Sequence, residues 1–104
     1  MTELNPLSKK EREKVEMYFS VTNLISTDFA SKSDPYLLLY LKSGNNWLPL
    51  GRTEIQWNQS NADFVKTFEV DFVFERRQLM RVECRDADDE HGEKYTPLGQ
   101  VILR

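Results

Sequence analysis

Apolar residues recur at every second position along several stretches of this chain, and this alternation constrains its fold more than any other feature. It runs over Val15–Val21, Phe68–Phe74 and Met80–Cys84. Successive side chains of a β-strand point to opposite faces, so a period of two predicts a strand with one buried face. The three stretches are therefore predicted to be strands of a sheet that covers a hydrophobic core.

Turn-forming residues bound three further stretches that are predicted to be extended. Leu37–Leu41 is continuously apolar, follows Pro35 and precedes the turn Ser43–Asn46, which is typical of a buried strand. Trp47–Trp57 and Gln100–Leu103 complete the set. Six strands without a convincing helix predict an all-β fold, an antiparallel β-sandwich.

The length of 104 residues gives room for one domain, and 39% hydrophobic against 30% charged residues is typical of a compact soluble protein. Residues 1–14 are polar, so they are predicted to be a flexible N-terminal arm before a domain at residues 15–104. No segment resembles a signal peptide or reaches the about 20 apolar residues of a membrane helix. A cytosolic location is therefore expected.

Charge and cysteine content argue against several classes of function. The net charge of -3 has the wrong sign for a generic nucleic-acid-binding protein. The single cysteine, Cys84, cannot form an internal disulfide or a cysteine-rich zinc site, and it is predicted to point inward. The sequence has no Gly-rich phosphate loop, serine nucleophile elbow or zinc-ligand spacing. We therefore expect neither nucleic-acid binding nor enzymatic activity.

Acidic residues gather at two places along the chain. Five carboxylates occupy the eight positions from Asp86 to Glu93, and Asp28 and Asp34 bracket another loop. Such density is repulsive unless water or a cation neutralises it, and Ca²⁺ takes about 6–8 oxygen ligands. Asp86 and Asp88 would share one side of a strand that continued that far. A solvated acidic loop and, at Asp34, ordinary turn chemistry are the alternatives to a cation site.

Several short segments of the chain resemble, in their residues and their order, segments of a known family of domains. Ala30–Tyr36, which contains S-D-P-Y, is similar to the end of the first calcium-binding loop of a C2 domain, and Asp86–Asp88 is similar to the D-x-D of its third loop. The first of two tandem C2 domains in copines has segments similar to Leu50–Glu54, Phe64–Phe68 and Leu98–Ile102. The resemblance covers nearly the whole chain.

This resemblance implies a C2-type antiparallel β-sandwich that lacks the last one or two of the family's eight strands. It also implies a cytosolic protein that is recruited to membranes, with the plasma membrane expected, when calcium rises. The cofactor would be Ca²⁺, and the partner would be an anionic phospholipid membrane, with other proteins as further candidates.

The resemblance also implies a set of calcium ligands. Asp88 and the other acidic positions match calcium-binding loops, whereas the fifth acidic ligand of the family is replaced here. Thr96 takes that position if Gly99 closes the loop, and Glu93 or Glu90 could take its place; a second alignment puts Leu98–Gln100 in the following strand. The six candidate ligands are Asp28, Asp34, Asp86, Asp88, Glu93 and Thr96.

Four further side chains are candidates for contact with lipid. Phe29 and Tyr95 either enter the headgroup region or pack against their own loops. Arg52 and Lys66 lie where C2 domains can bind phosphoinositides, or they belong to solvated strand faces. The alternative function is a calcium-independent β-sandwich that holds a protein partner by a strand edge or face.

Overall fold

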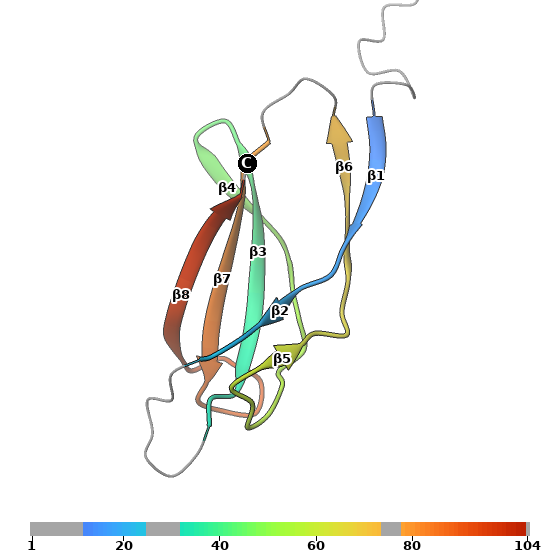
Figure 1. Ribbon diagram of the computed structural model, residues 1–104. Helices are drawn as coiled ribbons and strands as arrows, with labels where there is room; N and C mark the ends of the chain where they lie inside the picture. The colour runs from blue at the N-terminus through green and yellow to red at the C-terminus, as the bar shows by residue number, and fades with distance from the viewer. Residues whose placement is uncertain (1–11, 25–31, 74–77, 104) are drawn as a thin grey trace, which may run out of the picture.

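The structure is a computed structural model, and it describes residues 12–24, 32–73 and 78–103. These residues form eight strands and no helix (Figure 1), and so none of them belongs to a helix that could cross a membrane. The strands are β1 (Arg12–Met17), β2 (Ser20–Val21), β3 (Pro35–Ser43), β4 (Asn46–Arg52), β5 (Ala62–Asp63), β6 (Phe68–Val73), β7 (Met80–Ala87) and β8 (Tyr95–Leu103).

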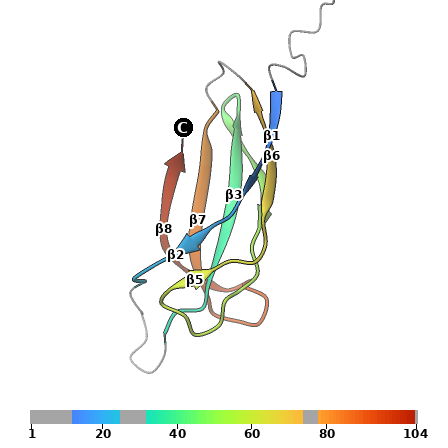
Figure 2. The same cartoon turned by 45° about the vertical axis from the view of Figure 1, so that its right-hand side comes forward.

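The strands form two layers, and every pairing is antiparallel. One layer is a four-stranded sheet in the order β4-β3-β7-β8. The other consists of the pairs β1-β6 and β2-β5, which lie against the first layer (Figures 1 and 2). The predicted antiparallel β-sandwich is therefore confirmed.

The hydrophobic core lies between the two layers. Alternate residues of β3, Leu37 and Leu39, and of β7, Met80 and Val82, point inward and are at most 7% exposed. The second layer covers them with the buried side chain of Phe68. The remaining buried members of this cluster are Ala62 and Phe64.

The opposite face of the four-stranded sheet has cations stacked on aromatic rings. The guanidinium of Arg81 lies 4.3 Å from the ring centre of Tyr40 and 5.1 Å from that of Trp47. The ammonium of Lys42, the residue opposite Trp47 in the β3-β4 pair, lies 5.1 Å from the centre of the Trp47 ring. These stacked pairs keep long charged side chains flat on a sheet face that the second layer does not cover.

Strand boundaries differ from the predicted ones where pairing rather than local pattern sets them. β1 begins at Arg12, inside the predicted arm, because Arg12–Lys14 pair with β6. The predicted strand Val15–Val21 is divided, since β1 pairs with β6 and β2 pairs with β5. The strand predicted over Trp47–Trp57 ends at Arg52, and residues 57–58 form a turn.

The last strand begins earlier than Gln100, at Tyr95, and it contains a bulge. Cys84 pairs with Gly99 while Arg85 pairs with Pro97, so the intervening Leu98 has no opposite residue. Leu98–Gln100 therefore lie within β8, as the second alignment predicted.

Candidate metal and membrane site

The antiparallel pairing of β3, β7 and β8 brings three candidate ligands to one end of the sheet, at the bottom of Figure 1. Asp86 lies opposite Pro35 on one side and opposite Thr96 on the other. The backbone N–H of Asp34 donates to Asp86 Oδ1 at 2.8 Å. Asp34 and Asp86, which are 52 positions apart in the sequence, are thus in direct contact.

Asp88 and Thr96 form a second contact at the same end. The hydroxyl of Thr96 donates to Asp88 Oδ2 at 3.0 Å, and the Asp88 N–H donates to the carbonyl of Lys94 at 2.8 Å. Asp86 is buried near the end of β7, whereas Asp88 is exposed just beyond it. Glu93 is exposed, and its described hydrogen bond is made by its backbone N–H.

Asp89, which the sequence analysis did not select, organises the loop between β7 and β8. Its carboxylate accepts the N–H groups of His91 at 3.1 Å, Glu93 at 2.9 Å and Lys94 at 3.0 Å. Partial burial raises the pKa of this carboxyl, but the donated N–H groups outweigh it and lower the pKa overall. An Asp followed by Gly92 in a short loop is the signal for such a turn.

Tyr36 anchors the same loop from β3. Its hydroxyl donates to the carbonyl of Gly92 at 2.7 Å, and its side chain is fully buried. Gly92 has a φ of +73°, and a Cβ at this position would lie 2.9 Å from Tyr36 Cζ. The tyrosine of the S-D-P-Y segment therefore fixes the position of the loop that follows β7.

The donor chemistry of the six candidate ligands suits a hard divalent cation, since all of them offer oxygen atoms. In the part of the chain that the structure describes, no three His, Cys, Asp or Glu side chains converge as a metal site. Two contacts join candidate ligands, namely the backbone N–H of Asp34 with the carboxylate of Asp86, and the hydroxyl of Thr96 with the carboxylate of Asp88. Asp28 and Phe29 lie outside the described residues.

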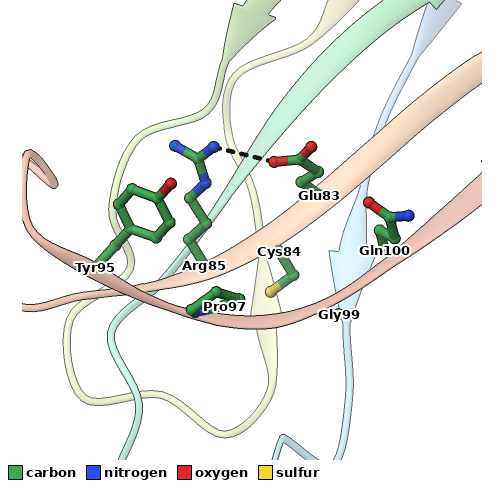
Figure 3. A pocket seen from close by; sticks show the side chains of 7 residues that line it. All are labelled: Glu83, Cys84, Arg85, Tyr95, Pro97, Gly99 and Gln100. Carbon is green, nitrogen blue, oxygen red and sulfur yellow. Dashed lines mark hydrogen bonds and ion pairs between the residues drawn. The ribbon is translucent and has the colours of Figure 1, made fainter.

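Tyr95, a candidate for membrane contact, is the first residue of β8 and is 40% exposed. The guanidinium of Arg85 lies 3.8 Å from the centre of its ring and donates to Glu83 Oε1 at 3.0 Å (Figure 3). These residues line a surface pocket of about 290 Å³ together with Cys84. Burial, with a smaller effect of the Asp86 charge, raises the pKa of the Cys84 thiol to about 11, so it is protonated at neutral pH.

Arg52 and Lys66 contact different aromatic rings. Arg52 stacks on Tyr36 at 5.0 Å, on the outer face of the four-stranded sheet. Lys66 lies 5.7 Å from the ring of Phe68, which belongs to the core on the inner face. Both are exposed, but the rings they contact lie on opposite sides of the sheet.

Comparison with known proteins identifies the family. The C2 domain model matches residues 15–104. Copine-D of Dictyostelium discoideum is 32% identical over 113 residues, which cover 95% of this chain and 21% of that protein. Copine-E of the same organism is 38% identical, over 88% of this chain and 18% of that protein. A solved structure described as a C2 domain has a TM-score of 0.67 at 22% identity, covering 88% of this chain and 73% of the other.

The chain is a two-layered antiparallel sandwich with acidic loops at one end, and the C2 domain model matches residues 15–104. This chain therefore belongs to the C2 domain family. Its similarity to Copine-D and Copine-E agrees with the copine resemblance of its sequence segments. The chain spans about a fifth of the length of these two relatives.

Proposed function

We propose that this chain is a calcium-dependent module for binding anionic phospholipid membranes, and that residues 15–104 are the unit responsible. One observation carries the proposal. The pairing of β3 with β7 puts the segment that carries Asp34 against Asp86, and Asp88 follows just beyond the same end of β7. Acidic residues from two loops at one end of a sheet are the oxygen donors that a cation held between those loops would use.

The proposed ligands are the side chains at and beyond the ends of β3, β7 and β8. Asp34 and Asp86 are held side by side, and Thr96 orients the carboxylate of Asp88. Bound Ca²⁺ would supply positive charge and coordination positions for lipid phosphates. The complete proposed set is Asp28, Asp34, Asp86, Asp88, Glu93 and Thr96.

Side chains next to these loops are proposed to contact the lipid. Phe29 and Tyr95 are the aromatic candidates for the headgroup region, where rings with one polar end are favoured. Arg52 and Lys66 are proposed to attract phosphoinositides, each from its own side of the sheet. The protein would then be cytosolic at low calcium and recruited to the plasma membrane when calcium rises.

Sedimentation with vesicles of phosphatidylserine and phosphatidylcholine, in calcium or in chelator, tests this function. We expect the chain to sediment with calcium only. Asp88→Asn removes one charge from the proposed ligand set and should weaken sedimentation about tenfold or more. Glu13→Gln removes an equal charge from an exposed side chain of β1, outside that set, and should change little. Equal binding in calcium and chelator would contradict the proposal.

The open edge of β8 favours the second candidate, a calcium-independent interaction module. Within the described residues β8 has a paired strand on one side only, and its nine residues include no charged side chain. Val101, Ile102 and Leu103 are 51%, 48% and 42% exposed. An uncharged edge can pair with its own copy without opposing like charges, so the occupant we propose is a second copy of this chain.

Sedimentation equilibrium in chelator tests this second candidate. We expect a dimer whose population falls when Val101→Lys places a charge on the edge of β8. The lysine of one copy would then face the lysine of the other, and the like charges would repel. Lys42→Gln, at the other side of the sheet, is the control. A strictly monomeric chain at tens of micromolar would exclude the second candidate.

A further inference from the structure

The segment between β4 and β5 is bound tightly to the segment that precedes β3. The N–H of Gln56 donates to the carbonyl of Pro35 at 2.9 Å, and the N–H of Gln59 donates to the carbonyl of Ser33 at 2.8 Å. Between them, the N–H of Asn58 donates to Asp34 Oδ1 at 2.6 Å. The turn at residues 57–58 is therefore a fixed part of the end of the molecule that holds Asp34 (Figure 1).

Trp57 stands at this turn and is 50% exposed. The next residue, Asn58, has a φ of 57° and accepts the N–H of Lys32 at 3.1 Å, so backbone geometry and hydrogen bonds fix the turn without using the indole. Exposing half of the largest apolar side chain to water is unfavourable by itself. The hydrogen bonds described above hold it there.

Trp47, the other tryptophan, has a different environment. It lies near the start of β4, at the opposite end of that strand, and it is partly buried between Lys42 and Arg81. The exposure of Trp57 is thus a property of its own turn, and it coincides with the end of the sandwich where Asp34, Asp86 and Asp88 lie.

We propose that Trp57 is a membrane-contacting side chain that enters the headgroup region of an anionic bilayer; this rests on the proposed function. Indole is favoured at the boundary between lipid and water, because its ring is apolar and its N–H is polar. The backbone N–H of Lys32 donates to the same turn, and the exposed side chain of this lysine adds a positive charge to the segment that contacts it. The proposed lipid contact therefore includes a third loop besides the two that hold the acidic residues.

Tryptophan fluorescence tests the proposal directly. In the variant Trp47→Phe, Trp57 is the only tryptophan. With calcium and phosphatidylserine vesicles we expect its emission to shift to shorter wavelength and to be quenched by lipids brominated near the headgroup. The matched variant Trp57→Phe, in which Trp47 is the reporter, should show neither change.

Affinity gives an independent measurement. Trp57→Ala should weaken vesicle binding about tenfold, since transfer of the ring out of water is lost. Leu48→Ala, which removes a 52% exposed side chain from the far end of β4, should leave binding unchanged. If the wild-type chain sediments with vesicles but Trp57 shows no spectral shift and its removal costs no affinity, the inference alone is wrong. If the wild-type chain does not sediment, the proposed function fails.

Discussion

At the scale of single residues, Glu54 shows how one carboxylate can hold two segments together. It accepts the Nε2 group of Gln56 at 2.7 Å and the N–H groups of Val65 and Lys66 at 2.7 and 3.1 Å. Partial burial raises its pKa, but these hydrogen bonds outweigh burial and lower the pKa overall. Glu54 thereby links the end of β4 to the segment before β6.

This geometry predicts a pH-dependent contribution of Glu54 to stability. Because its folded-state pKa is lowered, the contribution is present above the unfolded pKa of about 4.3 and is lost as pH falls through the folded pKa. Glu54→Gln should destabilise the chain by about 1 kcal/mol at pH 7, a small value because the group is partly exposed. Thermal unfolding of the wild-type chain and of Glu54→Gln from pH 7 to pH 3 measures this contribution. A difference in stability between the two that stays constant down to pH 3 would contradict the prediction.

The neighbouring Thr53 has a structural role as well. Its side chain is buried, accepts the N–H of Leu37 at 2.9 Å and donates to the carbonyl of Glu54 at 3.0 Å. In the sequence, the segment Leu50–Glu54 contributed to the resemblance to copine C2 domains. Its physical role as a connection between β3, β4 and the segment before β6 depends on contacts between distant residues.

At the scale of elements, the loop between β7 and β8 depends on β3. Asp89 accepts hydrogen bonds within the loop, and Tyr36 ties it to the sheet through Gly92. The loop is therefore ordered before any ligand arrives, and the cost of ordering it does not oppose binding.

Tyr36→Phe tests this anchor, because it removes the hydroxyl and keeps the ring. We expect a loss of about 1 kcal/mol of stability and faster amide hydrogen exchange at residues 88–94, with little change in the core strands. Tyr40→Phe, two positions along the same strand and on the same face, is the matched control. Unchanged exchange in the loop of Tyr36→Phe would show that the hydrogen bond does not position it.

Strand prediction worked best where the pattern is local. The alternation of Met80, Val82 and Cys84 places β7 correctly, because one face of this strand packs on the core. The start of β8 at Tyr95 could not be predicted, since Pro97, Gly99 and polar neighbours give no alternation. Pairing with β7 makes this segment a strand, and such pairing is a property of the sheet.

At the scale of the whole molecule, binding of a cation to the acidic end should stabilise the fold. A ligand that binds only the folded state raises the free energy of unfolding by an amount that grows with the ratio of its concentration to Kd. This amount is about 2.7 kcal/mol when the concentration is a hundred times Kd. If the proposed site is present, millimolar calcium should raise Tm by several degrees. Differential scanning calorimetry in calcium and in chelator measures this. Asp88→Asn should reduce the shift, and identical Tm values for the wild-type chain in both conditions would contradict it.

Part of the candidate site could be predicted from the sequence, and part follows only from the structure. The sequence singled out Asp34, Asp86 and Asp88 by type and spacing, and the structure brings the first two into contact and places the third just beyond the end of β7, where Thr96 donates to it. Trp57 had no signal of its own, because a tryptophan at the end of a stretch predicted to be extended is equally typical of a core strand. Its exposure follows from the hydrogen bonds that fix Asn58 and Gln59 to the segment before β3.

The sequence by itself determined the all-β class, the inward faces of β6 and β7 and the family to which the chain belongs, because alternation and short motifs are local properties of the chain. Only the tertiary structure decided which strands pair, where β1 and β8 begin, and which loops share one end of the sandwich. Hydrogen bonds between residues such as Tyr36 and Gly92, 56 positions apart, fix these features. Local sequence patterns do not specify contacts over that separation.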